Sequence, residues 1–124
     1  MRLWVWTADD SHPQGARLTR NRKLKAAVAE LSPADINLVL ERMPVPSRRE
    51  RWQKQAEGGH SDAEIAVAIE HFRFVTRRME DELAARGPWL AGATFSLADI
   101  SMVSLIHRVF ELFPTCCRAP AFPA

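Results

Sequence analysis

The stretch Thr94–Ser101, TFSLADIS, places a serine and an aspartate three residues apart at the start of the most apolar segment of the chain. Ser96 predicts a helix N-cap, because its hydroxyl can accept a hydrogen bond from an amide of the first turn. Asp99 stands where a carboxylate can reach back to the amide of the cap, which completes a capping box. Phe95 and Ile100 flank the cap and predict a hydrophobic staple.

The segment that follows this cap is apolar on all sides. Its large apolar side chains do not keep to one stripe; they are Met102, Val103, Leu105, Ile106, Val109, Phe110, Leu112 and Phe113. A helix that is apolar all round is typical of a position inside a core. We therefore expect a buried helix from Ser96 to Leu112, whose first-turn amides need internal partners because unpaired buried donors are costly.

The other segments also predict helices. Ser61 and Glu64 form a second capping-box pattern, and Gly87 followed by proline predicts the end of that helix. Its apolar stripe consists of Ile65, Ile69, Phe72, Val75 or Thr76, Met79 and Leu83. Ser32 predicts the start of a short helix, and RRERWQKQAEGGH predicts a short polar helix that stops at Gly58.

The first 31 residues predict one long, interrupted helix or a pair of helices, with the break near Pro13. No β-type alternation, hairpin signal or internal repeat is present. The sequence thus predicts an all-α bundle of about five helices around the buried helix.

Length, charge and apolar content limit the kinds of partner that the chain can have. The chain has 124 residues, which suits one domain, and its 17 basic and 15 acidic residues leave a net charge of +2. This balance argues against nucleic acid or an anionic membrane as a partner. We find no signal-peptide pattern and no apolar run of about 20 residues, and we expect a cytoplasmic protein. The adjacent Cys116 and Cys117 predict two unpaired thiols.

The sequence GPWLAGATFSLADISM resembles the central signature of the C-terminal helical domain of glutathione S-transferases. The matching positions are Trp89, Leu90, Gly92, Ser96, Ala98 and Asp99. The resemblance extends to MEDELAARGPWL and to the opening MRLWVW. The segment PVPSRRERW is similar to a bacterial subgroup that includes β-etherase-like proteins.

The resemblance implies a function for the chain as a whole. In intact relatives a thioredoxin-like domain binds glutathione and activates its thiol for attack on an electrophilic carbon. We expect residues 1–113 to form the helical domain, residues 114–124 to form an irregular Pro- and Cys-containing tail, and the thioredoxin-like domain to be absent.

The chain alone is then expected to bind no cofactor and to conjugate no glutathione. A homo-oligomer, or a partner covering the face left by that domain, is expected. The alternative is a stand-alone helical module for protein interaction or self-association.

The resemblance also indicates where a substrate would bind. The first helix of relatives lines the cleft for the hydrophobic co-substrate, which here points to Trp4, Thr7, Ala8 and Ser11. The alternative is that Trp4 and Trp6 pack against neighbouring helices. Asp9 and Asp10 either face solvent or contact glutathione across a dimer.

No catalytic residue and no metal ligand is predicted. The histidines, His12, His60, His71 and His107, do not have metal-ligand spacing, and His107 is expected to form a hydrogen bond within the core. Asp99 is explained by its cap role. The basic residues Arg17, Arg20, Arg22, Lys23 and Lys25 predict a solvated helix face, since no nucleic-acid motif accompanies them.

Overall fold

The structure, a computed structural model, describes residues 2–113, and every regular element in that range is a helix. The chain begins with α1 (Arg2–Thr19), a π-helical segment η1 (Arg20–Leu24) and α2 (Lys25–Ala29), which follow one another directly. The other helices are α3 (Pro33–Glu41), α4 (Pro46–Ala56), α5 (Asp62–Arg86) and α6 (Leu97–Leu112). If the run from α1 to α2 is taken as one rod, the described residues form five rods, as expected.

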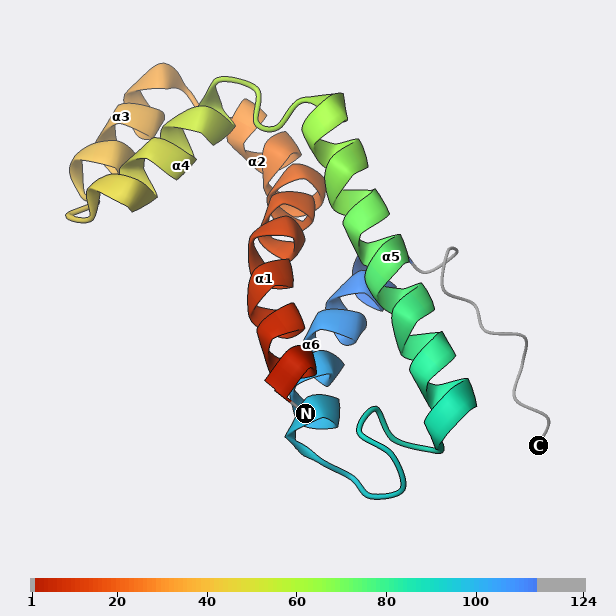
Figure 1. The fold of residues 1–124 in the computed structure, drawn as a ribbon. Coiled ribbons are helices and arrows are strands. Elements are labelled where there is room, and N and C mark those ends of the chain that lie inside the picture. The colour runs from red at the N-terminus through yellow and green to blue at the C-terminus, as the bar shows by residue number, and fades with distance from the viewer. Residues whose placement is uncertain (1, 114–124) are drawn as a thin grey trace.

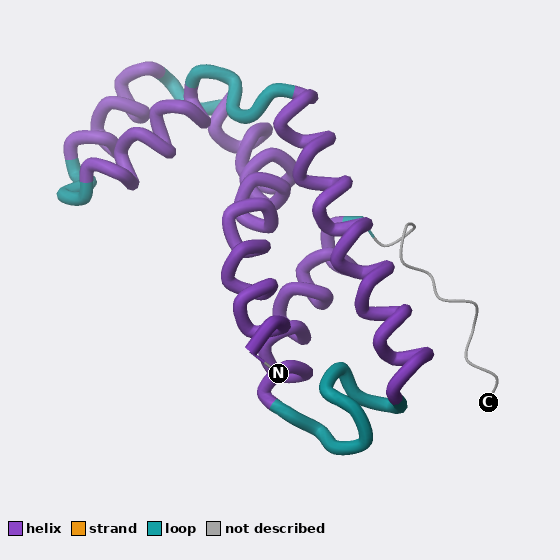
Figure 2. The backbone as a smooth tube through the Cα atoms, viewed as in Figure 1, coloured by secondary structure: helices purple, strands orange, loops and turns teal. Residues whose placement is uncertain are grey.

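Helices α1, α5 and α6 form the body of the molecule, and α1 contacts both of the others (Figure 1). Helices α3 and α4 form a hairpin at one end, where α4 also contacts α2. The loop that joins α5 to α6 lies at the opposite end (Figure 2). The first and the last described helices are therefore direct neighbours.

The apolar core lies where these three helices meet. Its buried side chains are Trp4, Leu18, Ala68, Phe72, Val75, Leu90, Ala98, Met102, Leu105, Val109 and Leu112. On each helix they recur mostly at steps of three or four residues, or multiples of these, so that one face is buried. The guanidinium of Arg78 lies 5.4 Å from the ring centre of Trp4 and covers the edge of this core.

Helix α1 runs through Pro13 without a break, and the interruption comes later, at η1. Proline has no N–H, so the carbonyl of Asp9 loses its helical partner. Asp9 and Pro13 are both exposed, and water can bind this carbonyl instead. The expected interruption is present, but its predicted place at Pro13 is wrong.

Helix α5 begins at the predicted capping box. The Ser61 hydroxyl accepts a hydrogen bond from the Glu64 amide at 3.2 Å, and Glu64 Oε2 accepts one from the Ser61 amide at 2.9 Å. Gly87 ends the helix at φ 120°, and Gly92 turns the following loop at φ 114°. Both backbone angles favour glycine, since other residues are strained there.

Helix α6 has two distinct faces, and the prediction that it is buried all round is wrong for the described chain. Its inner face holds the core residues, whereas large apolar side chains on its outer face are exposed: Leu97, Ile100, Val103 and Phe110. His107 is also exposed, which contradicts its expected place in the core. The helix is apolar all round, but the described residues cover only one side of it.

The predicted staple does not bury its two side chains. Phe95 is 58% exposed and Ile100 is 51% exposed. Phe95 packs edge-on against Trp89, with 4.9 Å between the ring centres. The staple itself stays a prediction, and the aromatic contact across the loop is an additional one.

The hairpin of α3 and α4 follows its proline and serine signals. The Ser32 hydroxyl accepts a hydrogen bond from the Asp35 amide at 3.2 Å, with Pro33 in the first turn. Helix α4 begins at Pro46, which is earlier than the basic run that predicted it, and ends before Gly58. Proline suits this first-turn position because its missing N–H needs no partner there.

Candidate functional site

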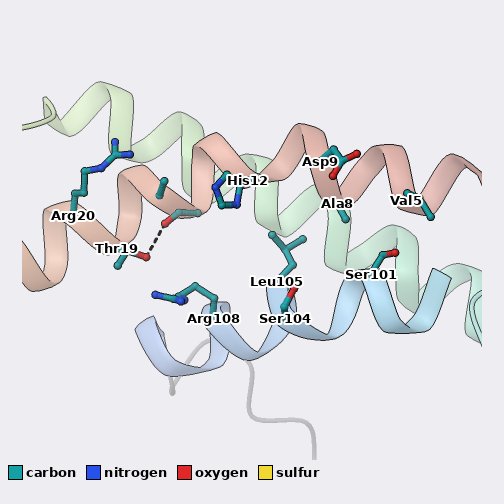
Figure 3. Close-up of a pocket in the computed structure, with 12 residues that line it drawn as sticks. Val5, Ala8, Asp9, His12, Thr19, Arg20, Ser101, Ser104, Leu105 and Arg108 are labelled. Carbon is teal, nitrogen blue, oxygen red and sulfur yellow. Dashed lines mark hydrogen bonds between the residues drawn. The ribbon is translucent and has the colours of Figure 1, made fainter. Parts of the chain in front are cut away.

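A groove of about 730 Å³ lies between α1 and α6 (Figure 3). We call it the α1–α6 groove. Its lining side chains recur three or four positions apart, which places them on one face of each helix. The first helical run supplies Val5, Ala8, Asp9, His12, Gly15, Ala16, Thr19 and Arg20, and α6 supplies Ser101, Ser104, Leu105 and Arg108. The volume is within the range of small-molecule sites.

The floor of the groove is apolar and its rim is charged. Leu105 is buried and points from α6 toward α1 in Figure 3. Asp9 and His12 on α1 and Arg108 on α6 are exposed. An apolar group can therefore lie along the floor while a polar group meets the rim.

Two of the three hydroxyl groups that line the groove, those of Thr19 and Ser101, are directed to backbone atoms. Thr19 Oγ1 donates to the Gly15 carbonyl at 2.8 Å, and Ser101 Oγ donates to the Leu97 carbonyl at 2.6 Å. Each hydroxyl proton is thereby engaged, so these oxygens can only accept from a ligand. Neither hydroxyl forms a hydrogen bond with a basic side chain in the described residues.

Positive charge gathers at the η1 end of the groove, where Arg20 and Arg108 lie (Figure 3). Burial lowers the pKa of Arg20, and repulsion from Arg51 and Arg17 lowers it further. The Nε atom of Arg108 is 3.8 Å from the Glu111 carboxylate. This end suits an electron-rich or anionic group on a ligand.

The predicted co-substrate residues do not all face this groove. Trp4, Thr7 and Ser11 are buried, and of the four predicted residues only Ala8 lines the groove. Thr7 donates to the Leu3 carbonyl at 2.8 Å. Trp6 is largely exposed, so of the two tryptophans only Trp4 packs in the core. A role in substrate binding stays a prediction, and in this geometry only Ala8 is placed for direct contact.

Ser11 forms an unexpected buried bridge to α5. Its side chain is 0% exposed and donates to the Thr7 carbonyl at 2.6 Å. It must then accept from His71 Nε2, 2.8 Å away, which makes Nε2 the protonated nitrogen. The sequence did not reveal His71 as a partner, because the two residues are 60 positions apart. The available signal was a polar residue at a core-facing position on each of two amphipathic helices.

The Asp99 carboxylate joins the α6 cap to the preceding loop. Its Oδ2 accepts from the Ser96 amide at 2.9 Å and from the Ser96 hydroxyl at 3.0 Å, while its Oδ1 accepts from the Leu90 amide at 2.9 Å. The Ser96 hydroxyl accepts in turn from the Ala98 amide at 3.2 Å. Burial raises the pKa of Asp99, but these hydrogen bonds outweigh it and leave the pKa below its ordinary 3.8.

Side chains that could bind a metal do not form a cluster in the part of the chain that the structure describes. No three His, Cys, Asp or Glu side chains gather there in a way that could hold a metal ion. His60 lies 3.4 Å from the Glu64 carboxylate and belongs to the α4–α5 junction. Cys116 and Cys117 lie outside the described residues. Across residues 2–113, no helix is both long and apolar enough to cross a membrane.

The fold and the cap define a class of protein, an all-helical domain with an Asp-clamped helix N-terminus. The family model of the glutathione S-transferase C-terminal domain matches residues 53–124, which is more than half of the chain. The chain therefore belongs to the glutathione S-transferase C-terminal domain family. No curated protein and no solved structure matches it.

Proposed function

We propose that this chain is the helical half of a glutathione S-transferase and that it holds the hydrophobic co-substrate in the α1–α6 groove. The observation that carries the proposal is the apolar floor of this groove beneath a polar rim. A small electrophile would lie against Leu105 and Ala8. Its polar end would meet Arg20 and Arg108.

We further propose that the chain does not conjugate glutathione alone. The reaction needs a group that stabilises the glutathione thiolate. Of the three hydroxyls that line the groove, those of Thr19 and Ser101 already donate to backbone carbonyls, and that of Ser104 is exposed, with no basic side chain hydrogen-bonded to it among the described residues. Family resemblance assigns thiol activation to a thioredoxin-like domain, which would act together with this one.

Two measurements test this proposal. The isolated chain is expected to show no turnover of 1-chloro-2,4-dinitrobenzene with glutathione above the uncatalysed rate, and no retention on immobilised glutathione. It is expected to bind the unreactive analogue 1,3-dinitrobenzene, with NMR shifts at the Leu105 and Ala8 methyl groups. Turnover by the chain alone would contradict its dependence on another domain.

A matched pair of variants tests the location. Ala8→Phe fills the groove and is expected to weaken 1,3-dinitrobenzene binding at least about tenfold, since buried contact area is lost to the ligand. Ala66→Phe adds the same side chain to an exposed position of α5 and is expected to leave binding unchanged. Equal binding by both variants would place the ligand elsewhere.

The second candidate function is a helical interaction or self-association module. The exposed outer face of α6 favours it, because Leu97, Ile100, Val103 and Phe110 form an apolar surface that another protein surface can cover. The two functions are compatible if the groove binds a small molecule while the outer face binds a second copy. Membership of the β-etherase-like subgroup is a further proposal, which rests on the segment PVPSRRERW alone.

A further inference from the structure

A second cavity adjoins the η1 end of the α1–α6 groove and lies between η1 and the α3–α4 hairpin. Its volume is about 480 Å³, and we call it the arginine cavity. It is lined by Arg20 and Leu24 of η1, by Arg42, Met43 and Pro44 after α3, and by Arg48, Arg51, Trp52 and Gln55 of α4. It shares only Arg20 with the α1–α6 groove.

Local structure explains why these side chains converge. On α4 the positions 48, 51, 52 and 55 follow three- and four-residue spacing, which places them on one face. On the facing side, the wider turn of η1 brings Arg20 and Leu24 to the same cavity. Segments of π-helix of this kind are frequent at functional sites.

The charge of the cavity is unbalanced. Four arginines line it and no carboxylate does. None of the four forms an ion pair with a carboxylate in residues 2–113. Arg51 is held by the Ser47 carbonyl at 2.9 Å, which fixes a guanidinium without neutralising it. Burial lowers the pKa of Arg20, and repulsion from the nearby positive charges of Arg51 and Arg17 lowers it further.

A second, independent observation is an unused hydrogen-bond donor. Gln55 is only 5% exposed, and its Nε2 is buried without an acceptor in the described residues. Buried amide donors are normally paired, since an unpaired one costs stability. Gln55 lines the cavity, and a rotation of its side chain away from Gly59 would bring this donor to an acceptor atom of a ligand there.

We propose that the arginine cavity binds a small organic anion that carries two or more negative charges next to a planar group. Guanidinium groups form bidentate hydrogen bonds with phosphate or carboxylate oxygens. Trp52, Met43, Pro44 and Leu24 supply the apolar surface for the planar part. The volume suits a small molecule, and the recess between helices differs from an open basic surface that would follow a nucleic-acid backbone.

Four probe compounds test separately whether the anionic group and the planar ring of the proposed ligand contribute to binding. Adenosine diphosphate carries phosphates and a ring, benzene-1,3,5-tricarboxylate carries carboxylates and a ring, pyrophosphate lacks the ring, and adenosine lacks the anion. Calorimetry on the full chain is expected to give saturable, salt-sensitive binding of one or both ring-bearing anions. Pyrophosphate is expected to bind more weakly and adenosine not at all.

Variants locate the binding and separate it from a structural role. Arg48→Gln and Arg51→Gln are each expected to weaken binding of the ring-bearing anion about tenfold or more, because each removes a charge-assisted hydrogen bond. Arg48→Gln is also expected to raise the melting temperature of the free chain, because it removes one of four like charges. In Arg51→Gln the loss of the hydrogen bond to the Ser47 carbonyl offsets this gain. The control Arg77→Gln removes an exposed charge on α5 and is expected to change neither binding nor the melting temperature.

Three results would overturn the proposal. One is the absence of saturable binding by either ring-bearing anion. The second is binding that the Arg48 and Arg51 variants retain. The third is an affinity for single-stranded oligonucleotides that rises steadily with their length and exceeds that for adenosine diphosphate, which would indicate an extended polyanion surface.

Discussion

At the residue scale, Asp99 connects two segments with one carboxylate. It closes the cap of α6 through Ser96 and holds the loop through the Leu90 amide. The cap could be predicted from the sequence because its partners are three positions apart. The contact with Leu90 could not, because it depends on how the loop folds back.

Asp99→Ala is expected to lower the free energy of unfolding by about 1 to 3 kcal/mol, through loss of the cap and of the acceptor for the Leu90 amide. Urea unfolding measures the change. The exposed Asp10→Ala is the control and is expected to shift stability by less than about 0.5 kcal/mol. If the two variants have the same free energy of unfolding, the hydrogen bonds of Asp99 do not stabilise the fold.

The low pKa of Asp99 also predicts a pH dependence. A carboxylate whose pKa is lower in the folded state stabilises the fold when ionised, so its contribution is present above 3.8 and is lost as the pH falls through the folded-state value. The stability advantage of the wild type over Asp99→Asn is therefore expected to be larger at pH 6 than at pH 2.5. A constant difference across this range would contradict the assignment.

The bridge between Ser11 and His71 is expected to couple α1 to α5. Ser11→Ala and His71→Ala should each destabilise the chain by about 1 kcal/mol or more, and the double variant should cost less than the sum of the two. A double-mutant cycle in urea measures this coupling. Strictly additive effects would mean that the 2.8 Å contact contributes nothing to stability.

At the element scale, α6 shows where sequence patterns stop being informative. The apolar composition predicts a helix in contact with a core, and its inner face confirms this for Met102 and Leu105. The pattern does not tell which face finds a partner, because apolar residues occur on all sides. The effect of Pro13 is equally hard to predict from sequence. Whether a helix breaks at a proline depends on whether the carbonyl left without a partner, here that of Asp9, can bind water.

Neighbouring residues of α6 offer a direct comparison of its faces. Met102→Ala is expected to cost about 2 to 4 kcal/mol of stability because it leaves a cavity in the core. Val103 is 63% exposed in the single chain, so Val103→Ala is expected to change the stability of the monomer by less than about 0.5 kcal/mol. Thermal unfolding of the two variants, at a dilution that keeps the chain monomeric, checks this difference, and equal losses would mean that both faces are covered within one chain.

At the scale of the whole molecule, the all-α fold followed from the sequence, whereas the candidate site did not. The α1–α6 groove needs residues about 90 positions apart to lie together, and no local pattern specifies that placement. Burial of Trp4, Thr7 and Ser11 follows from the same packing. A helical face predicted from spacing alone can turn toward the core or toward a cleft, and only the neighbouring helices decide between them.

The uncovered face of α6 predicts self-association. The chain is expected to sediment as a dimer or larger species at micromolar concentration, and Val103→Glu is expected to shift it toward the monomer because a charge cannot be buried there without a partner. Leu38→Glu places the same charge at an exposed apolar position on α3, far from α6, and should leave the assembly intact. A monomeric wild type would contradict this prediction.

The direct contact between the first and last described helices has a consequence during synthesis. While a ribosome is still making residues 30–96, α1 has no α6 to pack against, and its apolar face stays open to other binders in the cell. Contacts between residues far apart in the chain also slow folding, because a long loop must close before they form. Nascent chains stalled before residue 97 should therefore recruit a chaperone such as a holdase, and release should follow once α6 has emerged.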